Sequence, residues 1–192
     1  AKNSVNLGSL NLKGVGNTIF FEGVIATNNI KISGSINNWL SNISSEDNFG
    51  DLIIFFDNVD SEMLFPELST FKIKGPLKIT FFPVQKDDNV LVKSRFDFTK
   101  ADVYIPALAL KKIKGKNSQL KLDFTKDNRS IFYYSQSDVL VAGTASHKSS
   151  FEIKKVYYSK IKTPDINIER ATFQKFGEYN QFITDGGTIS LE

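Results

Sequence analysis

Cysteine is absent from this chain and histidine occurs once, and the two shortages together exclude several kinds of chemistry. Without cysteine the protein has no disulfide, no thiolate metal ligand and no cysteine nucleophile. The one histidine, His147, stands in a polar stretch between Ser146 and Lys148. A lone histidine without cysteine disfavours both a zinc site and a Ser-His-Asp triad. We therefore expect an exposed, uninvolved His147, no metal and no cofactor.

Long apolar runs and an excess of one charge are missing as well. No window approaches the roughly 18 consecutive apolar residues of a membrane-spanning helix, and the start AKNSVNLGSL lacks the regions of a signal peptide. Because the chain begins at Ala1 without an initiator methionine, we interpret it as a segment of a larger protein whose anchor and targeting sequence lie elsewhere. The 24 basic and 21 acidic residues give a net charge of only +3, which argues against nucleic acid as a partner.

Catalytic motifs are also lacking. The sequence has no GxSxG, no phosphate-binding loop and no GxGxxG. The run from Asp57 to Glu62 places Val59 where a calcium loop needs an oxygen ligand, and turns explain its carboxylates better. We expect no enzyme, and the one catalytic alternative is a hydrolase of envelope glycans that uses two carboxylates. Its residues would come from three acidic clusters: Glu46/Asp47, Asp57/Asp60/Glu62 and Asp87/Asp88.

Apolar residues at every second position dominate what is present. With 192 residues, 41% of them hydrophobic, the chain can bury a sizeable core. An alternation of period two is typical of half-buried β-strands, and turn signals about every 8 to 12 residues favour hairpins over crossovers. The sequence thus predicts a mostly β protein, an antiparallel meander that forms a curved, groove-like or sandwich-like sheet. The stripes are Leu10/Leu12, Ile30/Ile32/Ile36, Phe71/Ile73/Leu77/Ile79/Phe81, Val90/Val92/Phe96/Phe98, Leu120/Leu122/Phe124 and Ile166/Ile168.

Turns, bends and two interruptions divide this meander. We expect turns at Asn28-Asn29, Asp127-Asn128 and 185–187, and glycine bends at residues 23, 34 and 75. One or two short helices are expected, within 37–47 and after Asp60. The first interruption suggests an N-terminal β-hairpin region over residues 1–40 and a β-sheet domain over 41–192.

The stretch SRFDFTKADVYIPALALKKIKGK, residues 94–116, resembles a signature of large bacterial envelope proteins, "DLTGA…LP…GW.KPAGE". The chain is therefore similar to the AsmA-like group, the YhdP and TamB relatives. Weaker matches in the same order extend the resemblance from about Phe49 to the C-terminus. Leu110 stands where Trp is common, and Ile113 replaces Pro. The matching residues are Asp97, Phe98, Thr99, Ala101, Pro106, Lys112 and Gly115.

The resemblance implies a periplasmic segment of a protein anchored in the bacterial inner membrane. In this family a β-sheet groove is thought to carry phospholipid between the inner and outer membranes. The implied partners are phospholipid acyl chains, neighbouring β-segments of the same protein and envelope proteins. Because each buried methylene contributes about 0.8 kcal/mol, an acyl chain needs no specific residue chemistry to be held. The candidate lipid-binding residues are Phe71, Ile73, Leu77, Ile79, Phe81, Val92, Phe96, Phe98, Leu120, Leu122 and Phe124.

Two other interpretations of the same residues stay open. The apolar stripes also suit the closed core of a β-sandwich, in which case the chain is a non-enzymatic scaffold that docks partners through its sheet edges. The lysines at 111, 112, 114 and 116, and later at 154, 155, 160 and 162, are suited to anionic headgroups. Such runs are more often solvated loops or protection of sheet edges.

Overall fold

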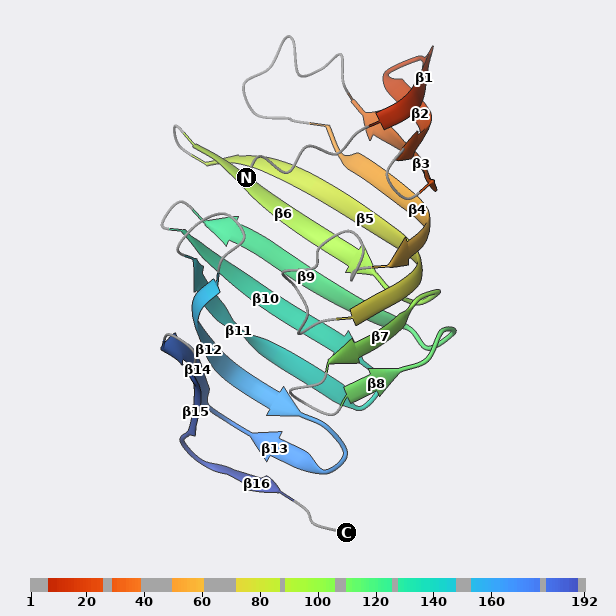
Figure 1. The fold of residues 1–192 in the computed structure, drawn as a ribbon. Coiled ribbons are helices and arrows are strands. Elements are labelled where there is room, and N and C mark those ends of the chain that lie inside the picture. The colour runs from red at the N-terminus through yellow and green to blue at the C-terminus, as the bar shows by residue number, and fades with distance from the viewer. Residues whose placement is uncertain are drawn as a thin grey trace.

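The structure is a computed structural model that describes residues 7–25, 29–38, 50–60, 72–86, 89–105, 110–125, 128–147, 153–176 and 179–189. These residues form one antiparallel sheet of sixteen strands and contain no helix (Figure 1). The expected mostly β, curved meander is therefore confirmed. The expected helices, within 37–47 and after Asp60, lie largely outside the described residues. No helix of the described part could cross a membrane.

Most strands pair with their neighbours in sequence. The main path through the sheet is β1-β2-β3-β4-β5-β6-β9-β10-β11-β12-β13-β16, while β7 and β8 extend from β5, and β14 and β15 extend from β12. The bounds are β1 Leu7–Val15, β2 Thr18–Ile25, β3 Ile30–Asn37, β4 Leu52–Asp60, β5 Lys72–Lys86, β6 Asn89–Asp97, β7 Asp102–Ile105, β8 Leu110–Lys112, β9 Ser118–Thr125, β10 Arg129–Gln136, β11 Val139–His147, β12 Ile153–Lys162, β13 Ile166–Ile168, β14 Ala171–Phe176, β15 Tyr179–Thr184 and β16 Gly187–Ile189.

The strand register places the apolar stripes on a single face of the sheet. Residues directly opposite in an antiparallel pair point to the same face. Leu12 pairs with Phe21, Ile79 with Phe96, and Phe96 with Leu120. Continued through the pairs of β10 to β13, the same face holds Ile161 and Ile168. We call this the inner face and the opposite one the outer face.

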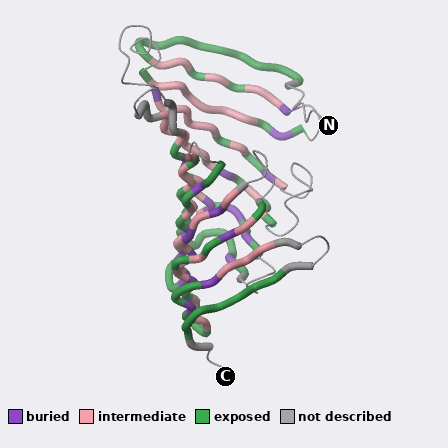
Figure 2. Tube along the Cα trace, turned by 90° about the vertical axis from the view of Figure 1, so that its left-hand side faces the viewer, coloured by how far each residue is buried: buried purple, intermediate pink, exposed green. Residues whose placement is uncertain are grey.

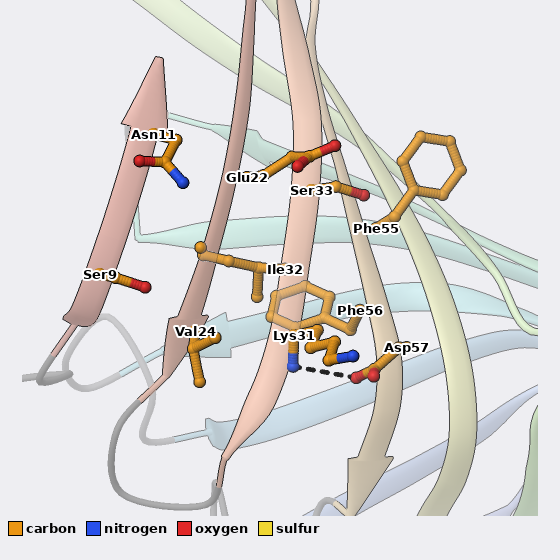
Figure 3. A pocket seen from close by; sticks show the side chains of 11 residues that line it. Ser9, Asn11, Glu22, Val24, Lys31, Ile32, Ser33, Phe55, Phe56 and Asp57 are labelled. Atoms are coloured by element: carbon orange, nitrogen blue, oxygen red, sulfur yellow. Dashed lines mark hydrogen bonds between the residues drawn. The ribbon is translucent and has the colours of Figure 1, made fainter.

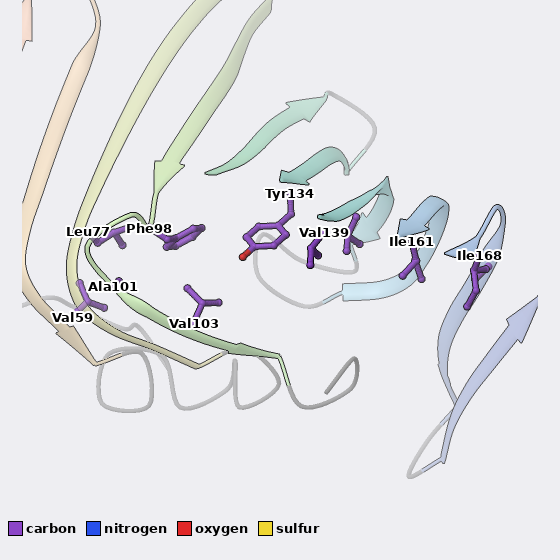
Figure 4. Close-up of a cluster of buried hydrophobic side chains, with 11 residues drawn as sticks. Val59, Leu77, Phe98, Ala101, Val103, Tyr134, Val139, Ile161 and Ile168 are labelled. Atoms are coloured by element: carbon purple, nitrogen blue, oxygen red, sulfur yellow. The ribbon is translucent and has the colours of Figure 1, made fainter. Parts of the chain in front are cut away.

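The buried core lies in the hollow of the curved sheet. Figure 4 shows Leu77, Tyr134, Val139 and Ile161 turned into this hollow, with Val103 of β7 on its far side. The outermost strand, β1, is exposed along its described length (Figure 2). The sheet is thus closed near β7 and open toward β1.

Three of the turns lie where the sequence predicts them. Asn29 and Asn128 adopt positive φ, 50° and 51°, at two of the expected turns. Gly186 does so at the third, with φ 75°. Gly75 has φ 119° opposite a register shift between Phe56 and Val59, so the expected bend at this glycine is confirmed. A bulge bends its strand, which adds to the normal sheet twist and curves the sheet.

The strands on either side of the expected domain boundary belong to the same sheet. β3 pairs with β4 in antiparallel register, with Ile36 opposite Leu52 and Ile32 opposite Phe56. The apolar stripe of the N-terminal strands therefore continues directly into that of β4 and β5.

Candidate functional site

The inner face forms an uncharged strip across the strands. One row of aligned residues runs Ile79, Phe96, Leu120, Tyr134 and Val141 from β5 to β11. A parallel row runs from Phe81 through Ser94, Leu122 and Phe132 to Gly143 in the same strands. None of the inner-face residues in the pairs that join β1 to β11 carries a charge.

Two polar side chains of the inner face, those of Ser94 and Tyr134, are buried and hydrogen-bonded. Ser94 is buried, and its hydroxyl donates to the carbonyl oxygen of Leu122 at 2.8 Å. The Tyr134 hydroxyl donates to Oε1 of Gln136 at 2.7 Å, and both side chains are buried. Burial raises the pKa of Tyr134 above its usual value. These hydrogen bonds satisfy the two hydroxyl groups within the fold.

Most of the candidate lipid-binding residues of the apolar stripes lie together on the inner face of the sheet. Ile73 packs against the buried cluster that also contains Leu77 and Phe98. Phe71 lies outside the described residues. Eight others share the inner face in register: Leu77, Ile79, Phe81, Val92, Phe96, Leu120, Leu122 and Phe124.

Exposure differs between the two halves of this strip. Val141, Ala145 and Ile161 of β11 and β12 are buried. In β5, β6 and β9, Leu77, Ser94 and Ser118 are buried, the other described inner-face side chains are partly buried, and Phe124 is 38% exposed. The half formed by β5, β6 and β9 therefore offers an apolar surface to a ligand.

Aromatic rings pack against Gly143 in the buried half of the inner face. Phe132 meets Tyr158 edge-on at 5.9 Å between ring centroids, and Tyr158 lies 6.0 Å from Phe182. Gly143 makes room for this arrangement, because a Cβ there would stand 2.8 Å from the Phe132 ring and 2.2 Å from the carbonyl oxygen of Tyr157. These packed rings belong to the buried half of the inner face, next to the half formed by β5, β6 and β9.

One end of the hollow is closed by a corner, residues 97–101 and 112–115, to which β7 and β8 are attached. The amide of Thr99 donates to Asp97 Oδ1 at 2.9 Å, and the amide of Phe98 donates to the Ser118 carbonyl at 3.0 Å. Gly115, with φ 93°, donates its amide to the Thr99 carbonyl at 2.7 Å. The described residues of the family-like signature thus meet at one structural corner.

Lys112 is the centre of this corner. Its side chain is 0% exposed, and Nζ donates to the carbonyl oxygens of Phe98, Thr99 and Ala101. Burial lowers the pKa of Lys112, while the carboxylates of Asp102 and Asp97 act in the opposite direction. The expectation that this lysine belongs to an exposed basic run is wrong, because its ammonium satisfies three backbone acceptors of a tight turn.

A separate hollow of about 490 Å³ lies at β1 to β4, lined largely by outer-face residues (Figure 3). Glu22, Lys31, Asn11 and Asp57 line it, and the amide of Lys31 donates to Asp57 Oδ1 at 3.0 Å. This hydrogen bond stands where the backbone hydrogen bonds of the β3–β4 ladder end, so strand pairing explains the position of Asp57.

The acidic residues of the described part of the chain do not form a metal site. There, no three His, Asp or Glu side chains are placed to hold a metal ion. Asp57 and Asp60 lie on β4. The other members of the acidic clusters, Glu46, Asp47, Glu62, Asp87 and Asp88, fall outside the described residues.

Comparison of the chain with models of protein families, with curated proteins and with solved structures finds no match in any of the three.

Proposed function

We propose that this chain is a non-enzymatic lipid-binding segment whose inner face holds phospholipid acyl chains. By its resemblance to the AsmA and YhdP group, we place it in the periplasm, within a protein anchored in the inner membrane that moves phospholipid toward the outer membrane. One observation carries the proposal. The inner face is uncharged from β1 to β11 and partly exposed at β5, β6 and β9.

The dimensions of the open half suit an acyl chain. Neighbouring strands lie about 4.8 Å apart, so the four strands β5, β6, β9 and β10 span about 14 Å. An acyl chain reaches across roughly half of a hydrocarbon core of about 30 Å. A chain laid across these strands would contact Ile79, Phe96 and Leu120, or Phe81 and Leu122 in the next row.

Binding of this kind is non-directional, which suits transport. Each methylene removed from water contributes about 0.8 kcal/mol, and no single hydrogen bond fixes the lipid in place. An acyl chain would therefore slide along the strip from one set of strands to the next, while its headgroup stays in water. The corner at Lys112 blocks one end of the hollow, so the lipid would lie toward Phe124 and Val92.

Photo-crosslinking in bacterial cells tests this proposal. A crosslinker at Ile79 or Leu122 is expected to label phospholipid, because both residues lie on the open half of the inner face. The controls are Lys13 and Ser35, outer-face residues of β1 and β3 that lie away from β5 to β10. Equal labelling at all four positions, or none at any, would contradict the proposal.

A scaffold role is the second candidate, and the edge strand β1 favours it. Leu12 is 68% exposed on a strand that ends the path through the described sheet. Such an edge can pair with a strand of a neighbouring β-segment or an envelope protein. Stoichiometric capture of a partner without lipid, lost in a Leu12→Glu variant, would support this role over the groove.

A further inference from the structure

Basic residues are concentrated on one part of the outer face. In β5 from residue 78, β6, β9 and β10, the outer-face side chains that the structure describes include five basic residues and two acidic ones, Asp97 and Asp123. The same face of β1 to β4 has two basic residues, Lys13 and Lys31, and three acidic ones, Glu22, Asp57 and Asp60. The five basic residues are Lys78, Lys93, Arg95, Lys121 and Arg129.

The centre of this patch places two like charges side by side. Arg95 of β6 is directly opposite Lys121 of β9. Like charges in directly opposite positions repel each other across a sheet, so the pair adds no favourable electrostatic contact to it. Among the described residues neither cation takes part in an ion pair. The Arg95 guanidinium lies 5.0 Å from the Phe82 ring centre and the Lys121 ammonium 5.6 Å from that of Tyr133.

Exposed apolar and aromatic side chains accompany these cations. Ile131 is 53% exposed and Tyr133 is 38% exposed on β10, next to Lys121 and Asp123 in the register. On β12, Tyr157 is 48% exposed beneath the ammonium of Lys155, and the lysines at 160 and 162 share its face. A soluble polyanion needs only the charges. Aromatic side chains among lysines and arginines suit the boundary between headgroups and acyl chains.

From this arrangement we propose that the outer face of β5 to β12 docks on the surface of an anionic phospholipid bilayer. Arg95, Lys121 and their neighbours contact the headgroup phosphates, and Ile131, Tyr133 and Tyr157 enter the headgroup layer. This surface is distinct from the inner face, so docking does not depend on acyl-chain binding in the groove. It would hold the protein at a membrane while the inner face remains open.

Vesicle flotation tests the docking surface. The protein is expected to float with vesicles containing phosphatidylglycerol, to remain behind with pure phosphatidylcholine, and to bind more weakly as salt rises. Each cation near such a surface contributes about fivefold to the partition coefficient. The double variant Arg95→Gln/Lys121→Gln should therefore bind about 25-fold more weakly. Both side chains are exposed strand positions, so the fold should survive.

The matched control removes the same total charge elsewhere on the outer face. Lys13→Gln/Lys31→Gln should bind within about twofold of the unaltered protein, because these lysines lie on β1 and β3, away from the patch. An equal loss in both double variants would mean that net charge alone drives adsorption, and would overturn the proposal. Binding to soluble polyphosphate or single-stranded DNA without flotation on either vesicle would also overturn it.

Discussion

At the scale of single residues, Lys112 is the clearest case of a side chain whose role the sequence conceals. In the sequence it is one of four lysines within six residues. In the fold it is buried, and its ammonium replaces water for three carbonyl groups of the corner. Charge runs predict exposure only on average, and the backbone acceptors of a distant turn cannot be seen in a local pattern. The resemblance to a family signature marked Lys112 and Gly115 but not their contact with Thr99.

We expect Lys112→Met to lower the free energy of unfolding by about 1–3 kcal/mol, because three buried acceptors lose their donor while the cost of burying the charge is removed. Urea unfolding measures the change. The control is Lys111→Met, an exposed neighbour on the same strand, which should stay within about 0.5 kcal/mol. Equal midpoints for the two variants would show that the ammonium does not support the corner.

Tyr134 of β10 gives the stability of the protein a dependence on alkaline pH. Burial raises its pKa, so the folded protein holds this proton more tightly than the unfolded chain does. The associated stabilisation is complete below the ordinary tyrosine pKa of about 10, and it is lost as the pH rises through the higher folded-state value. The free energy of unfolding should therefore fall more steeply above pH about 10 in the unaltered protein than in Tyr134→Phe.

The lowered pKa of Lys112 acts with the opposite sign, since rising pH relieves the cost of burying its charge. Lys112 is present in both proteins, so the difference between them isolates Tyr134. A difference that stays constant across the alkaline range would contradict the buried setting of this hydroxyl.

At the scale of elements, the strands and their faces are predictable, because alternation is a local property of each segment. The stripes at Ile30/Ile32/Ile36 and Leu120/Leu122/Phe124 lie on the inner face as their spacing implies. The placement of β7 and β8 is not predictable in this way. It depends on the bend at Gly75 and on contacts between residues 97–101 and 112–115, two segments that are not adjacent in the sequence.

Gly143 tests the packing of β10 against β11 and β12. We expect Gly143→Ala to lower the free energy of unfolding by about 2 kcal/mol or more, because the new methyl group meets the Tyr157 carbonyl and the Phe132 ring. Gly14→Ala on β1 is the control, since nothing lies within 4 Å of a Cβ there. That change should have an effect of about 0.5 kcal/mol or less. Similar stabilities of the two variants would refute the packing of Phe132 over Gly143.

At the scale of the whole molecule, the sheet separates two kinds of surface. The inner face carries the apolar residues, and the outer face of β5 to β10 carries Arg95, Lys121 and three other basic residues. The sequence predicts the first surface, because its residues form stripes. It does not predict the second, because cations spaced along separate strands become neighbours only when the register is known.

The central claim is that the inner face binds acyl chains, and native mass spectrometry of the purified protein with lipid extraction tests it most directly. Phe124 of β9 and Phe20 of β2 are both exposed apolar residues, on the inner and outer face respectively. Phe124→Asp should lose bound phospholipid, whereas Phe20→Asp, which changes the net charge equally, should retain it. Lipid retained by both variants, or absent from the unaltered protein, would contradict the account.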